Sequence, residues 1–132
     1  MSQCELVLDI ETIPGQAPWV WEDVAASVKP PGSMKKPETI EAWERDQKPQ
    51  AVLDAWLHTA LDGALGEVVV IGYAVDDGEA VTLSRGLGES EAELLQLASE
   101  SIASAVAQPA GQSQAPLIIG HYVSGFDLRF LW

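Results

Sequence analysis

Two acidic side chains near the N-terminus carry the clearest chemical signal in the sequence. Asp9 and Glu11 are separated by one residue, Ile10, at the end of an apolar run over residues 4–10. Pro14 and Gly15 terminate this segment. The run is short and rich in β-prone side chains, so it predicts a buried strand rather than a helix. Alternate side chains of a strand share a face, and both carboxylates therefore point to the same side of its C-terminal end.

A divalent cation would explain this pairing of carboxylates. Two negative charges this close repel each other, and a bound cation reverses the local electrostatics. The plain alternative is a solvated strand end that binds nothing, because a short Asp-x-Glu triplet also arises by chance. Asp9 and Glu11 are therefore candidate metal ligands, to be judged by what the rest of the chain places beside them.

A third acid follows another apolar segment near the C-terminus. Residues 117–121 predict a buried strand, and Asp127 stands at the start of a helix predicted over residues 126–132. Open α/β sheets gather their site residues at the carboxyl ends of strands. If this strand pairs in parallel with the first one, Asp127 lies near Asp9 and Glu11, and the three carboxylates can share two metal ions. Taken alone, Asp127 would be an acid at a helix N-terminus.

The elements between these acids predict an α/β protein. Residues 67–75 and 80–83 predict an antiparallel hairpin, and residues 89–108 predict an amphipathic helix. Two further helices are predicted to begin near Pro37 and Pro49, whereas the prolines and glycine within residues 17–33 predict loop. We expect a mixed sheet with helices on its faces, in a single domain spanning residues 1–132, with a helical insertion at about residues 15–62.

Length and composition narrow the class of protein. A chain of 132 residues can form one domain with a real core. It contains neither an apolar run near the roughly 18 residues of a membrane span nor a secretory leader pattern, so we expect a cytoplasmic protein without a membrane partner. The single cysteine, Cys4, excludes an internal disulfide and a cysteine zinc cage, and we expect it in the core.

The net charge of −13 argues against a broad surface for a phosphate backbone, which proteins normally bind with Lys and Arg. It does not exclude a metal-dependent nuclease, in which bound cations meet the phosphate locally. Five of the seven basic residues fall in one segment, which either contacts a nucleic-acid strand or forms an ordinary solvated surface; they are Lys29, Lys35, Lys36, Arg45 and Lys48.

The stretch Leu8-Asp9-Ile10-Glu11-Thr12 resembles the first motif of the DEDD 3′-5′ exonucleases, and residues 121–127 resemble the second. Within this family the chain is most similar to the phage- and prophage-type predicted exonucleases related to the proofreading domains of family B polymerases. The resemblance covers essentially the whole chain. It implies a ribonuclease H-like fold and hydrolysis of phosphodiester bonds at the 3′ end of a single strand, with DNA favoured over RNA.

The same resemblance assigns roles to individual residues. It implies that Asp9, Glu11 and Asp127 are the catalytic carboxylates and bind two Mg²⁺ or Mn²⁺ ions. It places three further side chains near the 3′-terminal nucleotide, namely Thr12, His121 and Phe126.

One family feature is absent from these 132 residues. The third motif, an Asp preceded four residues earlier by a Tyr or His that orients the attacking water, does not occur after Asp127. Because the sequence stops within a predicted helix, we expect a fragment that lacks the C-terminal strand and helices of the fold and has little activity alone. Residues 117–121 would then form an open sheet edge, available to a partner chain or to self-association.

Two other functions compete with the nuclease. Residues 9–13 approximate the D-x-D-x-T signature of haloacid-dehalogenase-like phosphatases, with Asp9 as a covalent nucleophile, but that interpretation leaves Phe126 and Asp127 unexplained. A non-catalytic nucleic-acid-binding or interaction module on the same fold is the second alternative. Metal binding that depends on Asp9 would separate a nuclease site from such a module.

Overall fold

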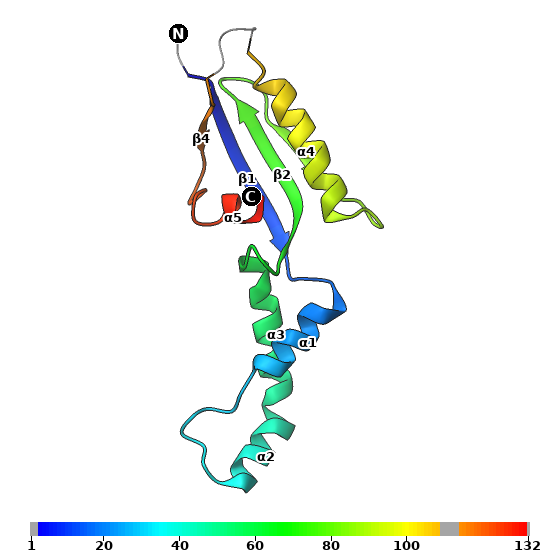
Figure 1. The fold of residues 1–132 in the computed structure, drawn as a ribbon, viewed down its shortest axis with the longest axis vertical. Coiled ribbons are helices and arrows are strands. Elements are labelled where there is room, and N and C mark those ends of the chain that lie inside the picture. The colour runs from blue at the N-terminus through cyan, green and yellow to red at the C-terminus, as the bar shows by residue number, and fades with distance from the viewer. Residues whose placement is uncertain (1–2, 109–113, 132) are drawn as a thin grey trace. The chain divides into compact units, whose positions relative to one another are not determined.

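The computed structural model describes residues 3–108 and 114–131, and the chain divides into two compact units. One unit comprises Met1–Thr12 and Val68–Trp132 and contains a mixed sheet with helices; the other, Ile13–Glu67, is helical (Figure 1). The expected α/β class, with a mixed sheet flanked by helices, is confirmed. That the chain forms a single domain stays a prediction.

The sheet of the first unit has four strands in the order β3-β2-β1-β4. Strand β4 pairs in parallel with β1, and β3 pairs antiparallel to β2. The hairpin and the parallel pairing that would bring Asp127 toward Asp9 are therefore both confirmed. The strands are β1 (Glu5–Ile13), β2 (Glu67–Val75), β3 (Val81–Ser84) and β4 (Leu117–Ile119).

Strand β1 separates an apolar face from an acidic one. Leu6, Leu8 and Ile10 are buried, whereas Asp9 and Glu11 between and beyond them are exposed. This period of two is the pattern of a strand with one face on the core, so the prediction that both carboxylates share a face is confirmed.

Two helices cover the apolar face of this sheet. Helix α4 (Glu91–Ala105) buries Leu94 and Ala98 against it, and α5 (Asp127–Leu131) packs there through partly buried side chains. A capping box begins α4: the Ser90 hydroxyl accepts from the Glu93 N–H at 3.2 Å, and the Glu93 carboxylate accepts from the Ser90 N–H at 2.9 Å. These bonds satisfy two backbone donors that have no intrahelical acceptor.

The helical unit contains α1 (Pro18–Ser27), α2 (Pro37–Asp46), α3 (Lys48–His58) and the short 3-10 helix η1 (Thr59–Leu61). The helices predicted near Pro37 and Pro49 are confirmed, but the prediction of loop throughout residues 17–33 is wrong for α1. Proline is compatible with the first turn of a helix, and Val20 and Val24, one turn apart, are buried in a cluster with Val52 of α3.

The structure also bears on the expectations for individual side chains and for membrane-spanning helices. Cys4 is buried, as expected, and so is Trp43. Among the residues that the structure describes, no helix has the length and apolar character needed to cross a membrane. Trp132, the last residue of the helix predicted over residues 126–132, lies outside the described residues.

In the described part of the chain, β4 forms one edge of the sheet, as predicted for an open C-terminal edge. Leu117 and Ile119 are exposed on it, and Val7, which is in register with Ile119 on β1, is exposed beside them. An apolar edge of this kind favours pairing between copies.

The double variant Leu117→Lys with Ile119→Lys is therefore expected to lower self-association, because charged side chains oppose edge-to-edge pairing. Light scattering coupled to size-exclusion chromatography measures it as a smaller apparent mass at high protein concentration. Leu87→Lys is the control, since Leu87 is fully exposed in a loop outside the strands. An equal effect of both variants, or none, would contradict a role for this edge.

Candidate functional site

Asp127 is a buried acid with an unsatisfied oxygen. It is the first residue of α5 and only 2% of its surface is exposed. Its Oδ1 atom has no hydrogen-bond partner among the described residues. A buried polar atom left unpaired costs roughly 1–3 kcal/mol, so such atoms are rare in native proteins, and a bound ion is one usual partner for them.

The electrostatics of Asp127 connect it to the first acidic motif. The pKa of Asp127 is raised above its ordinary value, mainly because burial removes water from the carboxylate, and the negative charge of Asp9 raises it further. The backbone N–H groups of Asp127 and Ile10 and the charge of His121 lower it. The carboxylate of Asp127, after β4, therefore interacts electrostatically with that of Asp9 on β1.

A tight loop between β4 and α5 produces this proximity. Its first residue, Gly120, lies so close to β1 that a Cβ there would stand 2.7 Å from the Leu8 carbonyl oxygen. The loop then turns back on itself, because the Gly125 and Phe126 N–H groups both donate to the Tyr122 carbonyl, at 3.1 and 3.0 Å. The loop thus starts against β1 beside Asp9 and ends at Asp127.

Glu11 shares the exposed face of β1 with Asp9. Across the described ranges, however, no set of three or more His, Cys, Asp or Glu side chains is arranged to hold a metal ion. The charge of Asp9 acts on Asp127, but no three-residue group that would include Glu11 is found among the described residues. A three-carboxylate centre stays a prediction.

The three residues predicted to contact the nucleotide lie in different surroundings. His121 is exposed in the loop, and Thr12 is half-buried near the end of β1. Phe126 packs against the core, with its ring 5.1 Å from that of Phe130, centroid to centroid. Phe126 therefore helps to hold α5 on the sheet, and the nucleotide contacts of all three residues stay predictions.

Sequence reasoning did not single out Tyr122, which has two unusual properties. Its side chain is 71% exposed, and its backbone φ of 52° lies in the left-handed region that non-glycine residues seldom adopt. The available signal was an aromatic residue in a short loop bounded by Gly120 and Gly125, next to the predicted site.

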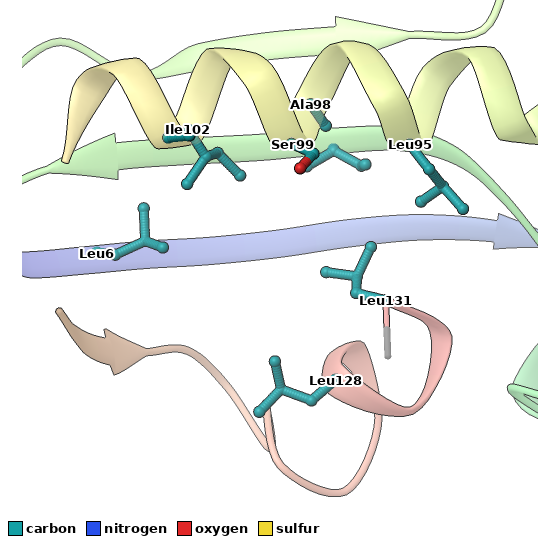
Figure 2. Close-up of a pocket in the computed structure, with 9 residues that line it drawn as sticks. Leu6, Leu95, Ala98, Ser99, Ile102, Leu128 and Leu131 are labelled. Atoms are coloured by element: carbon teal, nitrogen blue, oxygen red, sulfur yellow. The ribbon is translucent and has the colours of Figure 1, made fainter. Parts of the chain in front are cut away.

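A separate apolar pocket of about 300 Å³ lies between α4 and α5, over β1 and β2. Figure 2 shows Leu95 and Ile102 of α4 on one side of it, opposite Leu6 and Leu131. Ser99 supplies a hydroxyl to this lining, which contains no titratable side chain. The pocket can accept apolar groups, but it offers no acid–base or metal chemistry.

Comparison with known proteins adds no relative: no protein-family model, curated protein or solved structure matches the chain. The function is therefore inferred from the acidic motifs of the sequence and from the loop between β4 and Asp127. Those residues, rather than the apolar pocket, combine charge, burial and an unsatisfied ligand atom.

Proposed function

We propose that this chain carries the metal site of a 3′-5′ exonuclease on a ribonuclease H-like fold, which acts on single-stranded nucleic acid, with DNA favoured over RNA. The observation that carries the proposal is the buried, unpartnered Oδ1 of Asp127 within reach of the charge of Asp9. The parallel β1–β4 pair and the antiparallel β2–β3 hairpin support the fold assignment.

The residues present fit a hard divalent cation, which prefers oxygen ligands. Asp127 offers a carboxylate oxygen without a protein partner, and Asp9 adds a second negative charge that otherwise only repels the first. Glu11, on the same face of β1 as Asp9, is the proposed third ligand for a pair of Mg²⁺ or Mn²⁺ ions, although the described residues form no three-ligand group in this structure. Bound there, such ions supply an activated water and stabilise negative charge on the attacked phosphate.

The fold of the protein holds the proposed ligands in position. Asp9 is fixed on β1, whose alternate side chains anchor the strand in the core, and Asp127 is fixed by the tight loop and by α5. His121 is exposed in the same loop and interacts electrostatically with Asp127. In the proposed site, its imidazole donates a hydrogen bond to the bound nucleotide.

The test is thermal unfolding at pH 7 with and without MnCl₂. Wild-type protein is expected to be stabilised, by about 2.7 kcal/mol at a Mn²⁺ concentration 100 times the dissociation constant. Asp9→Asn is expected to lose most of this stabilisation. Asp77→Asn, in the exposed hairpin turn, is the matched control and is expected to keep it. Equal Mn²⁺ effects in all three proteins, or no effect in wild type, would exclude the assigned site.

A second measurement concerns turnover. Because these 132 residues lack the water-orienting Tyr or His of the third motif, we expect slow Mg²⁺-dependent release of nucleotides from a 3′-labelled single strand. Asp9→Asn and Asp127→Asn are expected to abolish the release. Undiminished release by either variant would show that the activity arises elsewhere.

A non-catalytic nucleic-acid-binding module on the same fold is the second candidate. It is favoured by one observation, the absence of a three-ligand metal group within the described residues. Single-strand binding that is indifferent both to Mn²⁺ and to Asp9→Asn would support the module over the nuclease.

A further inference from the structure

We propose that Tyr122 is a nucleobase-stacking residue, on which a base of the bound single strand rests beside the acidic site. This inference rests on the proposed function, since it names the group that receives the substrate of that site. It assigns a role to a side chain outside the three residues that the motifs place near the nucleotide.

The first observation is the placement of the ring. Tyr122 is 71% exposed, although large aromatic side chains are usually buried in the cores they stabilise. The ring lies over Gly125, so closely that a Cβ at that position would overlap its far end. A flat aromatic surface thus lies against the loop backbone and is open to solvent.

The second observation is the conformation of the backbone. Glycine and asparagine adopt a φ of 52° readily, whereas a tyrosine is strained there. Two hydrogen bonds to the Tyr122 carbonyl, from the Gly125 and Phe126 N–H groups, keep it in this state. Strained residues of this kind persist where surrounding contacts enforce them, and they cluster at ligand-binding sites.

The third observation is the position of the loop. It starts at Gly120, against the Leu8 carbonyl, and ends at Asp127, and the charge of His121, the neighbour of Tyr122, acts on Asp127. The exposed ring of Tyr122 therefore belongs to the loop that ends at Asp127, the residue whose carboxylate interacts with Asp9. A ligand bound by Asp9 and Asp127 would therefore lie next to this loop.

The chemistry of the chain selects the ligand class. With a net charge of −13, the protein has few cations to hold a phosphate backbone along its length. Stacking of bases on aromatic rings contributes affinity without cations and tolerates any base sequence. An exposed tyrosine in the loop of the acidic site therefore suits the base of a strand whose phosphate is bound at that site.

The test is binding of a fluorescently labelled oligothymidylate whose 3′ linkage is a hydrolysis-resistant phosphorothioate, followed by anisotropy in MnCl₂. Tyr122→Gly removes the ring and accommodates the left-handed backbone, and it is expected to weaken binding about tenfold or more. Tyr122→Trp is expected to bind as tightly as wild type or more tightly. Trp19→Ala, which removes an exposed ring from the helical unit, is the control and is expected to bind normally.

Stability measurements separate a stacking role from a structural one. Tyr122→Gly is expected to keep its melting temperature and its Mn²⁺ stabilisation, whereas a ring that only supports the fold predicts a loss of both. Wild-type binding that Tyr122→Gly leaves unchanged would overturn the stacking role and leave the nuclease site standing. Wild-type protein that binds neither Mn²⁺ nor the strand would overturn the proposed function, and the stacking role with it.

Discussion

In metal-free buffer at pH 7, Asp127→Asn is expected to be more stable than wild type, which is measured as a higher free energy of unfolding. The reason is that burial and the charge of Asp9 both disfavour the ionised Asp127 carboxylate. Asparagine removes the charge but keeps an oxygen that can accept from the backbone N–H groups of Ile10 and residue 127.

The sign of the pH dependence follows from the raised pKa. Because the folded protein binds a proton at Asp127 more readily than the unfolded chain does, this group destabilises the fold above its folded pKa. As the pH falls through that raised pKa toward the ordinary value of 3.8, the penalty disappears. The advantage of Asp127→Asn over wild type is therefore expected at neutral pH and lost near pH 4.

Urea unfolding in EDTA across this pH range measures the effect, and Asp77→Asn in the exposed turn is the control. Added Mn²⁺ at pH 7 is expected to reverse the order, since it stabilises wild type and not Asp127→Asn. A variant that is less stable than wild type at pH 7 without metal would show that the Asp127 carboxylate makes a favourable contact instead.

Gly120→Ala is expected to lower the free energy of unfolding by about 1–3 kcal/mol and to remove most of the stabilisation by Mn²⁺. An added Cβ would lie 2.7 Å from the Leu8 carbonyl oxygen and 2.9 Å from the Cβ of Val123. The carbonyl belongs to a paired strand and cannot easily move, so the loop must shift away from β1. That shift separates Asp127 from Asp9.

Gly32→Ala is the matched control, because a Cβ at position 32 meets no atom within 4 Å. Its free energy of unfolding is expected to stay within about 0.5 kcal/mol of wild type, as for most surface substitutions. Thermal unfolding with and without MnCl₂ measures both variants. If Gly120→Ala unfolded like Gly32→Ala and kept the Mn²⁺ effect, the close approach of the loop to β1 would not position the site.

Much of the first unit was predictable because its signals are local. The alternation of buried and exposed residues along β1 follows from the two-residue period of a strand, which fixes Asp9 and Glu11 on one face. The hairpin likewise follows from a turn sequence, and α4 follows from the helical spacing of its apolar residues. Even the neighbourhood of Asp127 could be expected, since parallel strands place their carboxyl ends at the same edge.

Helix α1 shows where local signals fail. Prolines and a glycine around it predicted loop, yet burial of Val20 and Val24 against Val52 stabilises ten helical residues. That contact joins segments about 30 residues apart in the chain, and the sequence of neither segment predicts it. Tertiary packing outweighs weak helix propensity in this way because burial of several apolar side chains contributes more than the preference of any one residue.

By itself, the sequence determined the class of fold, the faces of β1 and the identity of the acidic residues, because strand period, turn chemistry and side-chain type are properties of neighbouring residues. Only the tertiary structure decided that Asp127 is buried with an oxygen that has no partner among the described residues, and that Tyr122 is exposed with a strained backbone. These properties depend on how closely the loop after β4 approaches β1, and that distance is set by contacts between segments more than 100 residues apart.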